Sequence, residues 1–226
     1  MKLDREIQWQ AGRALSGFTL LELLITVAII SILTALATTN YLTALPKMRA
    51  RDAARQIWSD IHVARSQAVK AKQDVVIIFY PAGNIYSIVI DVGHNMGPDS
   101  AGKYCVVDLE GADKDKYIVQ NKHLPEGIVF ANGIGLPPTV DGEPMGDGVR
   151  LANKCVFFQS SGRASNGNSD QSGDALSANS NRSVYVIPLE YLQKNNFNAF
   201  FGVVIEGISG LPKVKKYIPE GHKWED

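Results

Sequence analysis

The sequence predicts an α+β protein in which a long N-terminal transmembrane and amphipathic α-helix packs on an antiparallel β-sandwich-like C-terminal domain. An uncharged run from Leu23 to Pro46 leads into an apolar stripe of helical period, which predicts one long helix. After Asp74 the pattern changes to short β-branched segments separated by turn residues, which is typical of antiparallel sheets.

Charge is distributed unevenly along the 226 residues, although the formal net charge is zero. Residues 47–72 carry seven basic and two acidic side chains, whereas residues 73–226 carry 13 basic and 18 acidic ones. A basic helical segment therefore precedes a mildly acidic body. This balance does not favour nucleic-acid binding by the body as a whole.

The uncharged run is long enough to cross a membrane. Its 24 residues would span about 36 Å as a helix, against roughly 30 Å for a bilayer core. A secretory signal peptide ending near Ala35-Leu36-Ala37 is one alternative, and a plain signal anchor is another. The apolar region of a signal peptide would normally be shorter. A plain signal anchor does not explain Glu22, because a carboxylate in hydrocarbon is costly and is usually functional and partnered.

A third interpretation uses the polar segment that precedes the run. Residues 1–17 end at Gly17, and their positive charges would keep them cytoplasmic. The basic residues are Lys2, Arg5 and Arg13. A cut between Gly17 and Phe18 would give Phe18 a free amine and make Glu22 the fifth residue. Among parallel helices, the amine of one subunit could then neutralise Glu22 of the next.

The stretch "GFTLLELLITVAIISIL" resembles the class III signal of type IV pilins and type II secretion pseudopilins. The resemblance implies that a prepilin peptidase cuts after Gly17 and methylates Phe18, and that Glu22 is an assembly contact. It also implies a pilin fold and a structural role beside other pilin or pseudopilin subunits. One departure is Thr39, where family members often carry proline, so a helix kink is expected near Pro46 or not at all.

The resemblance implies four domains and a location. The leader is 1–17, the transmembrane and filament-core helix is 18–45, and the amphipathic continuation is 46–72. A periplasmic β-rich domain of residues 73–226 follows. The protein would cross the bacterial inner membrane once and enter a pilus or pseudopilus.

Within residues 47–72, small and branched apolar residues recur at spacings of four and three. They are Ala50, Ala54, Ile57, Ile61, Ala64 and Ala68. We expect this stripe to pack on the following domain; a nucleic-acid or lipid-headgroup surface is the alternative for this basic segment. The adjoining "ARSQAV" and "KAKQDVVIIFY" resemble the GspH/FimT branch of the family.

The body is expected to hold nine short strands, the first two joined by a hairpin at "PAGN". They are Val75–Tyr80, Ile85–Asp91, Tyr104–Leu109, Tyr117–Gln120, Ile128–Phe130, Cys155–Gln159, Ser183–Leu189, Phe201–Glu206 and Val214–Ile218. Residues 160–183 are rich in serine, asparagine and glycine, which predicts a mobile surface loop without a core. "VFFQSSGRAS" and "FGVVIEGISGLPKVKKY" resemble the late strands of GspH/FimT-like domains.

The two cysteines, Cys105 and Cys155, lack metal-ligand spacing. Outside the cytoplasm a disulfide between them is plausible, and two buried thiols are the alternative.

No motif for nucleophilic, phosphate-binding or metal chemistry occurs, so neither an enzyme nor a cofactor is expected. The acidic loops Asp108–Asp115 and Asp141–Gly148 do not fit the EF-hand pattern; solvated turns are the default and a calcium site the alternative.

The expected function is a minor pseudopilin or minor pilin of a type II secretion pseudopilus or type IV pilus. The alternative is a FimT-like pilin that binds DNA during uptake, with weak phosphate contacts from Lys213, Lys215 and Lys216. The arginines associated with that activity are absent here, and the lysines also fit charge decoration of an edge strand.

Overall fold

The structure is a computed structural model that divides into two compact units, with the boundary between Thr43 and Ala44. The described residues are 18–92, 117–132, 136–142, 146–151, 154–165, 182–206 and 209–226.

One helix, α1 (Leu20–Ala71), covers the predicted transmembrane and amphipathic segments in 52 residues. Pro46 lies inside it and the helix continues through that position. Proline removes one backbone hydrogen bond from a helix interior. The helix is therefore not interrupted at Pro46, and a kink there stays a prediction.

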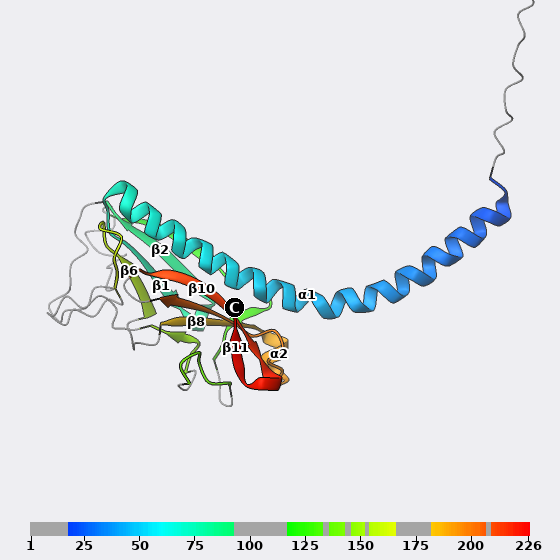
Figure 1. Cartoon of the computed structure of the whole chain (residues 1–226). Helices are drawn as coiled ribbons and strands as arrows, with labels where there is room; N and C mark the ends of the chain where they lie inside the picture. Colours follow the sequence, from blue (N-terminus) through cyan, green and yellow to red (C-terminus); the bar gives the residue numbers. More distant parts are fainter. Residues whose placement is uncertain are drawn as a thin grey trace, which may run out of the picture. The chain divides into compact units, whose positions relative to one another are not determined.

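In the second unit, the predicted stripe of α1 forms part of the main core. Ala50, Ala54, Ile61, Ala64 and Ala68 have no exposed surface, and Ile57 is also buried. Alanine side chains are short, so the strands approach the helix axis closely. Figure 1 shows this part of α1 lying along the strands of the body. The interpretation of the stripe as a packing face is confirmed.

The first antiparallel sheet has the strand order β3-β2-β1-β6-β7. Its strands are β1 (Val75–Tyr80), β2 (Ile85–Asp91), β3 (Tyr117–His123), β6 (Cys155–Phe158) and β7 (Ala164–Ser165). The expected hairpin joins β1 to β2 through a 3-10 turn, Pro81–Gly83, and Asn84 follows in the left-handed conformation with φ 52°. Asparagine tolerates that conformation better than most residues.

The second antiparallel sheet has the order β11-β10-β9-β8-β4, and β5 also pairs with β8. Its strands are β4 (Ile128–Phe130), β5 (Val149–Arg150), β8 (Ser183–Pro188), β9 (Phe201–Glu206), β10 (Leu211–Ile218) and β11 (Lys223–Glu225). A short helix, α2 (Leu189–Gln193), follows β8, and a 3-10 turn, Pro219–Gly221, joins β10 to β11.

The two sheets and α1 share one hydrophobic core. Alternate residues of β1, such as Ile77 and Phe79, enter it together with Val184 and Val186 of β8 and the alanine stripe of α1. The α+β class, with a helix packed on antiparallel sheets, is therefore confirmed.

Several expectations for the body need correction. β3 continues to His123, three residues beyond its predicted end, whereas β6 and β8 each end one residue earlier than predicted, at Phe158 and Pro188. β10 begins at Leu211 rather than Val214 and includes Pro212, whose missing N–H does not prevent pairing with Ile205. The segment 160–183 is not loop throughout, because β7 lies in it and Ala164 is buried in the main core. The strand expected at Tyr104–Leu109 and the acidic loop Asp108–Asp115 lie outside the described residues.

Candidate functional site

The N-terminus of α1 is capped by a side chain. The Thr19 Oγ1 atom accepts a hydrogen bond from the backbone N–H of Glu22 at 3.2 Å, and the helix begins at the next residue, Leu20. Threonine is a preferred N-cap residue, and threonine followed three residues later by glutamate is the spacing of a capping box. The sequence analysis did not identify this cap, although the Thr19-Leu20-Leu21-Glu22 spacing is its recognisable signal.

Glu22 lies in the first turn of α1 and is exposed. The helix dipole favours a negative charge at this end. Among the described residues, no cation forms an ion pair with its carboxylate. Phe18 is 80% exposed, and Gly17 lies outside the described residues. Cleavage after Gly17 and the assembly contact of Glu22 therefore stay predictions.

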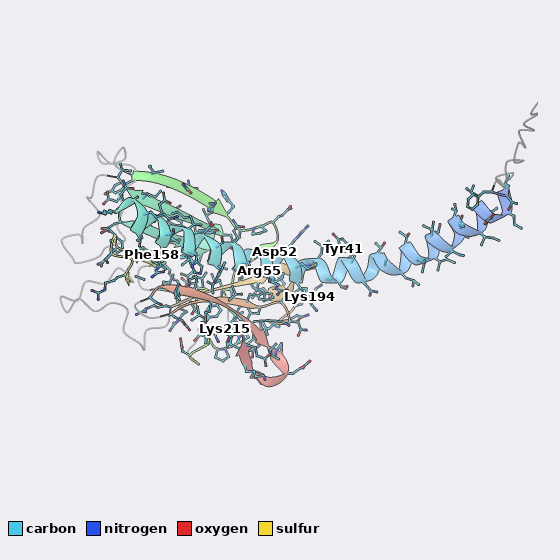
Figure 2. The ribbon with its side chains drawn as sticks, turned by 45° about the horizontal axis from the view of Figure 1, so that its top comes forward. Tyr41, Asp52, Arg55, Phe158, Lys194 and Lys215 are labelled. Atoms are coloured by element: carbon cyan, nitrogen blue, oxygen red, sulfur yellow. The ribbon has the colours of Figure 1, made fainter. Side chains whose placement is uncertain are left out.

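The first half of α1 presents an apolar surface on all sides. Residues Leu20–Thr38 have a mean hydropathy of 2.5, none of them is buried, and they form the one described helix long and apolar enough to cross a membrane. Figure 2 shows their side chains radiating around the helix. An apolar surface this large is unstable in water and marks a membrane or protein contact.

The hydroxyl groups within this helix form hydrogen bonds with its own backbone. Thr26 donates to Leu23, Ser31 to Val27, and Thr34 to Ile30, at 2.7 to 2.8 Å. Thr38 donates to Thr34 in the same way, at 2.8 Å. Unsatisfied polar groups are costly in hydrocarbon, so these bonds reduce the cost of placing the helix there. Glu22 is the one charged residue in Leu20–Thr38.

Within the second unit, polar contacts fix α1 to both sheets. The Trp58 indole donates to the Pro212 carbonyl oxygen of β10 at 2.8 Å. The Tyr86 hydroxyl of β2 donates to the Asp60 carboxylate at 2.6 Å. Burial, and secondarily this bond and the negative charge of Asp60, raises the pKa of Tyr86 far above its usual value.

The three lysines considered for DNA contact lie on β10 but do not form one surface. Lys213 pairs with Glu206 at 2.6 Å, and Lys215 pairs with Asp226 at 2.9 Å. Lys216 lies on the opposite face of the strand from Lys213 and Lys215, and it lines a pocket beside α1. Two of the three ammonium groups are thus already paired with carboxylates.

Cys155 begins β6, is completely buried and is disulfide-bonded. Cys105, the other cysteine of the sequence, lies outside the described residues, so its pairing with Cys155 stays a prediction.

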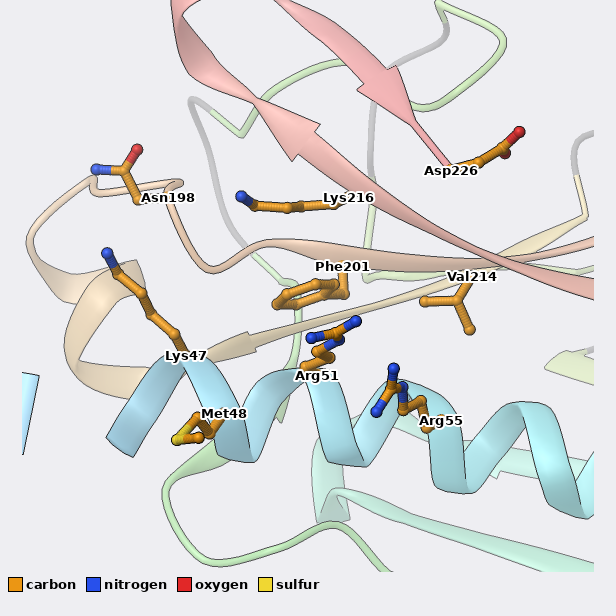
Figure 3. A pocket seen from close by; sticks show the side chains of 9 residues that line it. All are labelled: Lys47, Met48, Arg51, Arg55, Asn198, Phe201, Val214, Lys216 and Asp226. Atoms are coloured by element: carbon orange, nitrogen blue, oxygen red, sulfur yellow. The ribbon is translucent and has the colours of Figure 1, made fainter. Parts of the chain in front are cut away.

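A basic pocket of about 750 Å³ lies between α1 and the second sheet. We call it the basic pocket; its cations are Lys47, Arg51, Arg55 and Lys216. Met48, Asn198, Phe201, Val214 and Asp226 complete its lining. Figure 3 shows Lys47, Arg51 and Arg55 projecting from one side of α1 toward the strands. The sequence analysis noted the basic helix but could not place Lys216 beside it.

Within the described residues, no three histidine, cysteine, aspartate or glutamate side chains lie close enough to hold a metal ion. Asp141 and Asp147, which belong to the second predicted acidic loop, therefore form no metal-binding cluster with other described residues.

Comparisons with known proteins single out the N-terminal segment. A family model described as the prokaryotic N-terminal methylation motif matches residues 13–38. No curated protein matches the chain.

Two solved structures, both of the minor pseudopilin EpsH from the type 2 secretion system of Vibrio cholerae, are weakly similar. One has 11% identity and a TM-score of 0.41, over 74% of this chain and 97% of the other. The second has 14% identity and a TM-score of 0.38, over 74% and 94%. Likeness at this level does not indicate a function.

The motif match covers the residues on which the sequence resemblance was based: Gly17, Phe18 and Glu22 all lie within residues 13–38. The same segment contains the capping threonine and the exposed apolar half of α1. The chain thus carries the prokaryotic N-terminal methylation motif over residues 13–38.

Proposed function

We propose that the chain is a processed, pilin-like structural subunit, a GspH/FimT-like minor pseudopilin or minor pilin that assembles into a type II secretion pseudopilus or a type IV pilus. One observation carries the proposal: the segment that matches the methylation motif, residues 13–38, includes an exposed apolar helix, Leu20–Thr38. Such a helix needs a membrane before assembly and neighbouring helices after it.

The proposed cut between Gly17 and Phe18 suits the start of α1. Thr19 supplies the cap and Leu20 begins the helix, so the cap lies on the retained side of the cut. Removal of residues 1–17 by a prepilin peptidase would therefore leave the first turn capped. Methylation of the new Phe18 amine would modify the residue immediately before the cap.

Glu22 then has a defined electrostatic partner. After cleavage, the positive Phe18 amine of a neighbouring subunit can approach the exposed Glu22 carboxylate in the filament core. Pairing offsets the cost of burying each charge and fixes the axial offset between adjacent subunits. The Glu22 carboxylate also lies where the helix dipole favours it.

The proposed location and partners follow from insertion of residues 18–45 in a membrane. Residues 18–45 hold the subunit in the inner membrane, with the basic leader on the cytoplasmic side. The β-rich domain then lies in the periplasm, where a disulfide at Cys155 persists. The partners are other pilin or pseudopilin subunits and the peptidase.

The proposal is tested by the incorporation of Glu22 variants. Glu22→Ala and Glu22→Gln should both remain in the membrane fraction but be depleted from sheared filaments, because each lacks the charge. Glu22→Asp keeps the charge and should assemble better than either. Incorporation of Glu22→Gln at the wild-type level would remove the assembly role of the carboxylate.

DNA uptake is the weaker candidate. The pairing of Lys213 with Glu206 and of Lys215 with Asp226 reduces the positive charge offered to phosphates.

A further inference from the structure

We propose that the basic pocket binds the phosphate of an anionic phospholipid headgroup in the leaflet from which α1 emerges. Its four cations, Lys47, Arg51, Arg55 and Lys216, surround a cavity of about 750 Å³. A pocket of that size falls within the range of small-molecule sites, roughly 300–1,000 Å³.

The charges of the pocket are available to a ligand. Across the described part of the chain, none of its four cations forms an ion pair, whereas Lys213, Lys215 and Lys223 each do. Asp226 is the one carboxylate in the lining, and it is engaged by Lys215 at 2.9 Å. Figure 3 shows its side chain directed away from the four cations. The pocket therefore has an uncompensated positive charge.

The arrangement of the cations suits a phosphate group. Lys47, Arg51 and Arg55 are spaced four residues apart, so about 6 Å of helix rise separates each from the next. Each arginine presents a planar fork that can bind two phosphate oxygens at once. Lys216 reaches the same cavity from β10, so the site needs both the helix and the sheet.

The lining is also partly apolar. Met48 is 59% exposed, while Phe201 and Val214 form part of the wall beside the cations. A free inorganic anion gains nothing from these side chains. The glycerol and first methylenes of a phospholipid would cover them, which favours a lipid over a free phosphate.

The position along the chain identifies the membrane as the source. Lys47 is the first charged residue after the uncharged run that ends at Pro46. Basic residues immediately outside a membrane span are attracted to anionic lipids by about 1 kcal/mol each. This step depends on the proposed membrane insertion of residues 18–45, so the experiment measures insertion separately.

The test uses the full-length chain, purified in an uncharged detergent. Binding of dihexanoyl phosphatidylglycerol, dihexanoyl phosphatidylcholine and inorganic phosphate is measured by titration calorimetry. Arg51→Ala and Arg55→Ala are the test variants. Arg49→Ala is the matched control, because Arg49 lies on the same segment of α1 and carries the same charge but does not line the pocket.

The expected result is selective binding of phosphatidylglycerol, weakened roughly fivefold by each test variant and unchanged by Arg49→Ala. If Arg49→Ala weakens phosphatidylglycerol binding as much as the test variants do, the effect is one of diffuse charge and the proposal is wrong. If inorganic phosphate binds as tightly as phosphatidylglycerol, the pocket is a simple anion site and the proposal is also wrong. If the test variants keep lipid selectivity but lose association with other subunits, the pocket is a protein interface and the lipid assignment is wrong.

Insertion is measured with the same proteins by flotation with pure phosphatidylcholine vesicles. Failure of the wild type to float would contradict the membrane anchor of the proposed function. If the wild type floats but does not bind phosphatidylglycerol selectively, only the proposed lipid binding by the basic pocket is contradicted.

Discussion

The Trp58 indole Nε1 donates a hydrogen bond to the carbonyl oxygen of Pro212, at 2.8 Å and across 154 residues of sequence. The bond joins the exposed flank of α1 to β10 beside the buried alanine stripe. It uses a carbonyl of the one residue of β10 that has no N–H. The proline and the tryptophan together therefore fix the position of β10 against the helix.

Trp58→Phe should lower the free energy of unfolding of the second unit by about 1 kcal/mol, because it removes this bond and keeps an aromatic side chain. Chemical denaturation of the full chain in detergent measures the change. Ser59→Ala, at the next and exposed position of α1, is the control and should have little effect. An equal effect of the two variants would show that the Trp58–Pro212 bond contributes nothing to stability.

Two glycines with similar backbone angles should respond differently to alanine. Gly148 has φ +78°, and a Cβ there would lie 2.5 Å from the Ala131 carbonyl oxygen and 2.6 Å from its nitrogen. Gly142 has φ +83°, and a Cβ added there would have no other atom within 4 Å.

Gly142→Ala should cost about 1–2 kcal/mol, which is the penalty of the left-handed conformation alone. Gly148→Ala should cost more, because the backbone of Ala131 must also move and the adjacent bond from the Tyr185 N–H to the Gly148 carbonyl oxygen would be disturbed. Thermal unfolding compares the two variants. Equal melting temperatures would contradict the close approach of Gly148 to Ala131.

Tyr86 should make the stability of the body sensitive to high pH. Its pKa is raised in the folded state by burial and then by Asp60, whereas the unfolded value is about 10. The folded state therefore holds the phenolic proton more tightly. The stabilisation is complete below pH of about 10 and is lost as the pH rises above it.

Tyr86→Phe should be less stable than wild type at neutral pH, by about 1 kcal/mol for the lost bond to Asp60. Its stability should then fall less steeply than that of the wild type as the pH rises above about 10. Chemical denaturation of the wild type and of Tyr86→Phe at several pH values gives the slope of the unfolding free energy against pH for each protein. Tyr185 and Tyr217, whose pKa values burial also raises, are present in both proteins and cancel in the comparison. Parallel curves would contradict a folded-state pKa shift at Tyr86.

The β10 lysines should not give a DNA-binding activity. At physiological salt the wild type should cause no gel shift of duplex DNA, because Lys213 and Lys215 are paired with carboxylates. A shift that disappears when Lys213, Lys215 and Lys216 are changed to alanine would restore the DNA-uptake alternative. A shift that persists in this variant would place any DNA contact elsewhere.

The local pattern predicted most of the elements on which the fold depends. The spacing of Ala50 through Ala68 gave the buried face of α1, and β1, β2, β4 and β9 have the predicted bounds. These signals are local: apolar period, β-branched runs and turn residues. The motif around Gly17 and Glu22 is equally local and is matched by the family model.

Features that depend on distant partners were not predicted. β5, β7 and β11 have two or three residues each, too few to show a period, and they form because a neighbouring strand offers pairing. The basic pocket is a similar case, since Lys216 joins Lys47, Arg51 and Arg55 only through the packing of β10 near α1. The start of β10 was misplaced because proline usually ends strands.

The most direct test of the proposed subunit is the mass of its N-terminus. Full-length protein is produced in cells with an active prepilin peptidase, extracted from the membrane and measured intact and after proteolysis. We predict a chain that begins at Phe18 and carries one methyl group on the Phe18 amine. A chain that still begins at Met1 under these conditions would contradict processing, and with it the assembly role of Glu22.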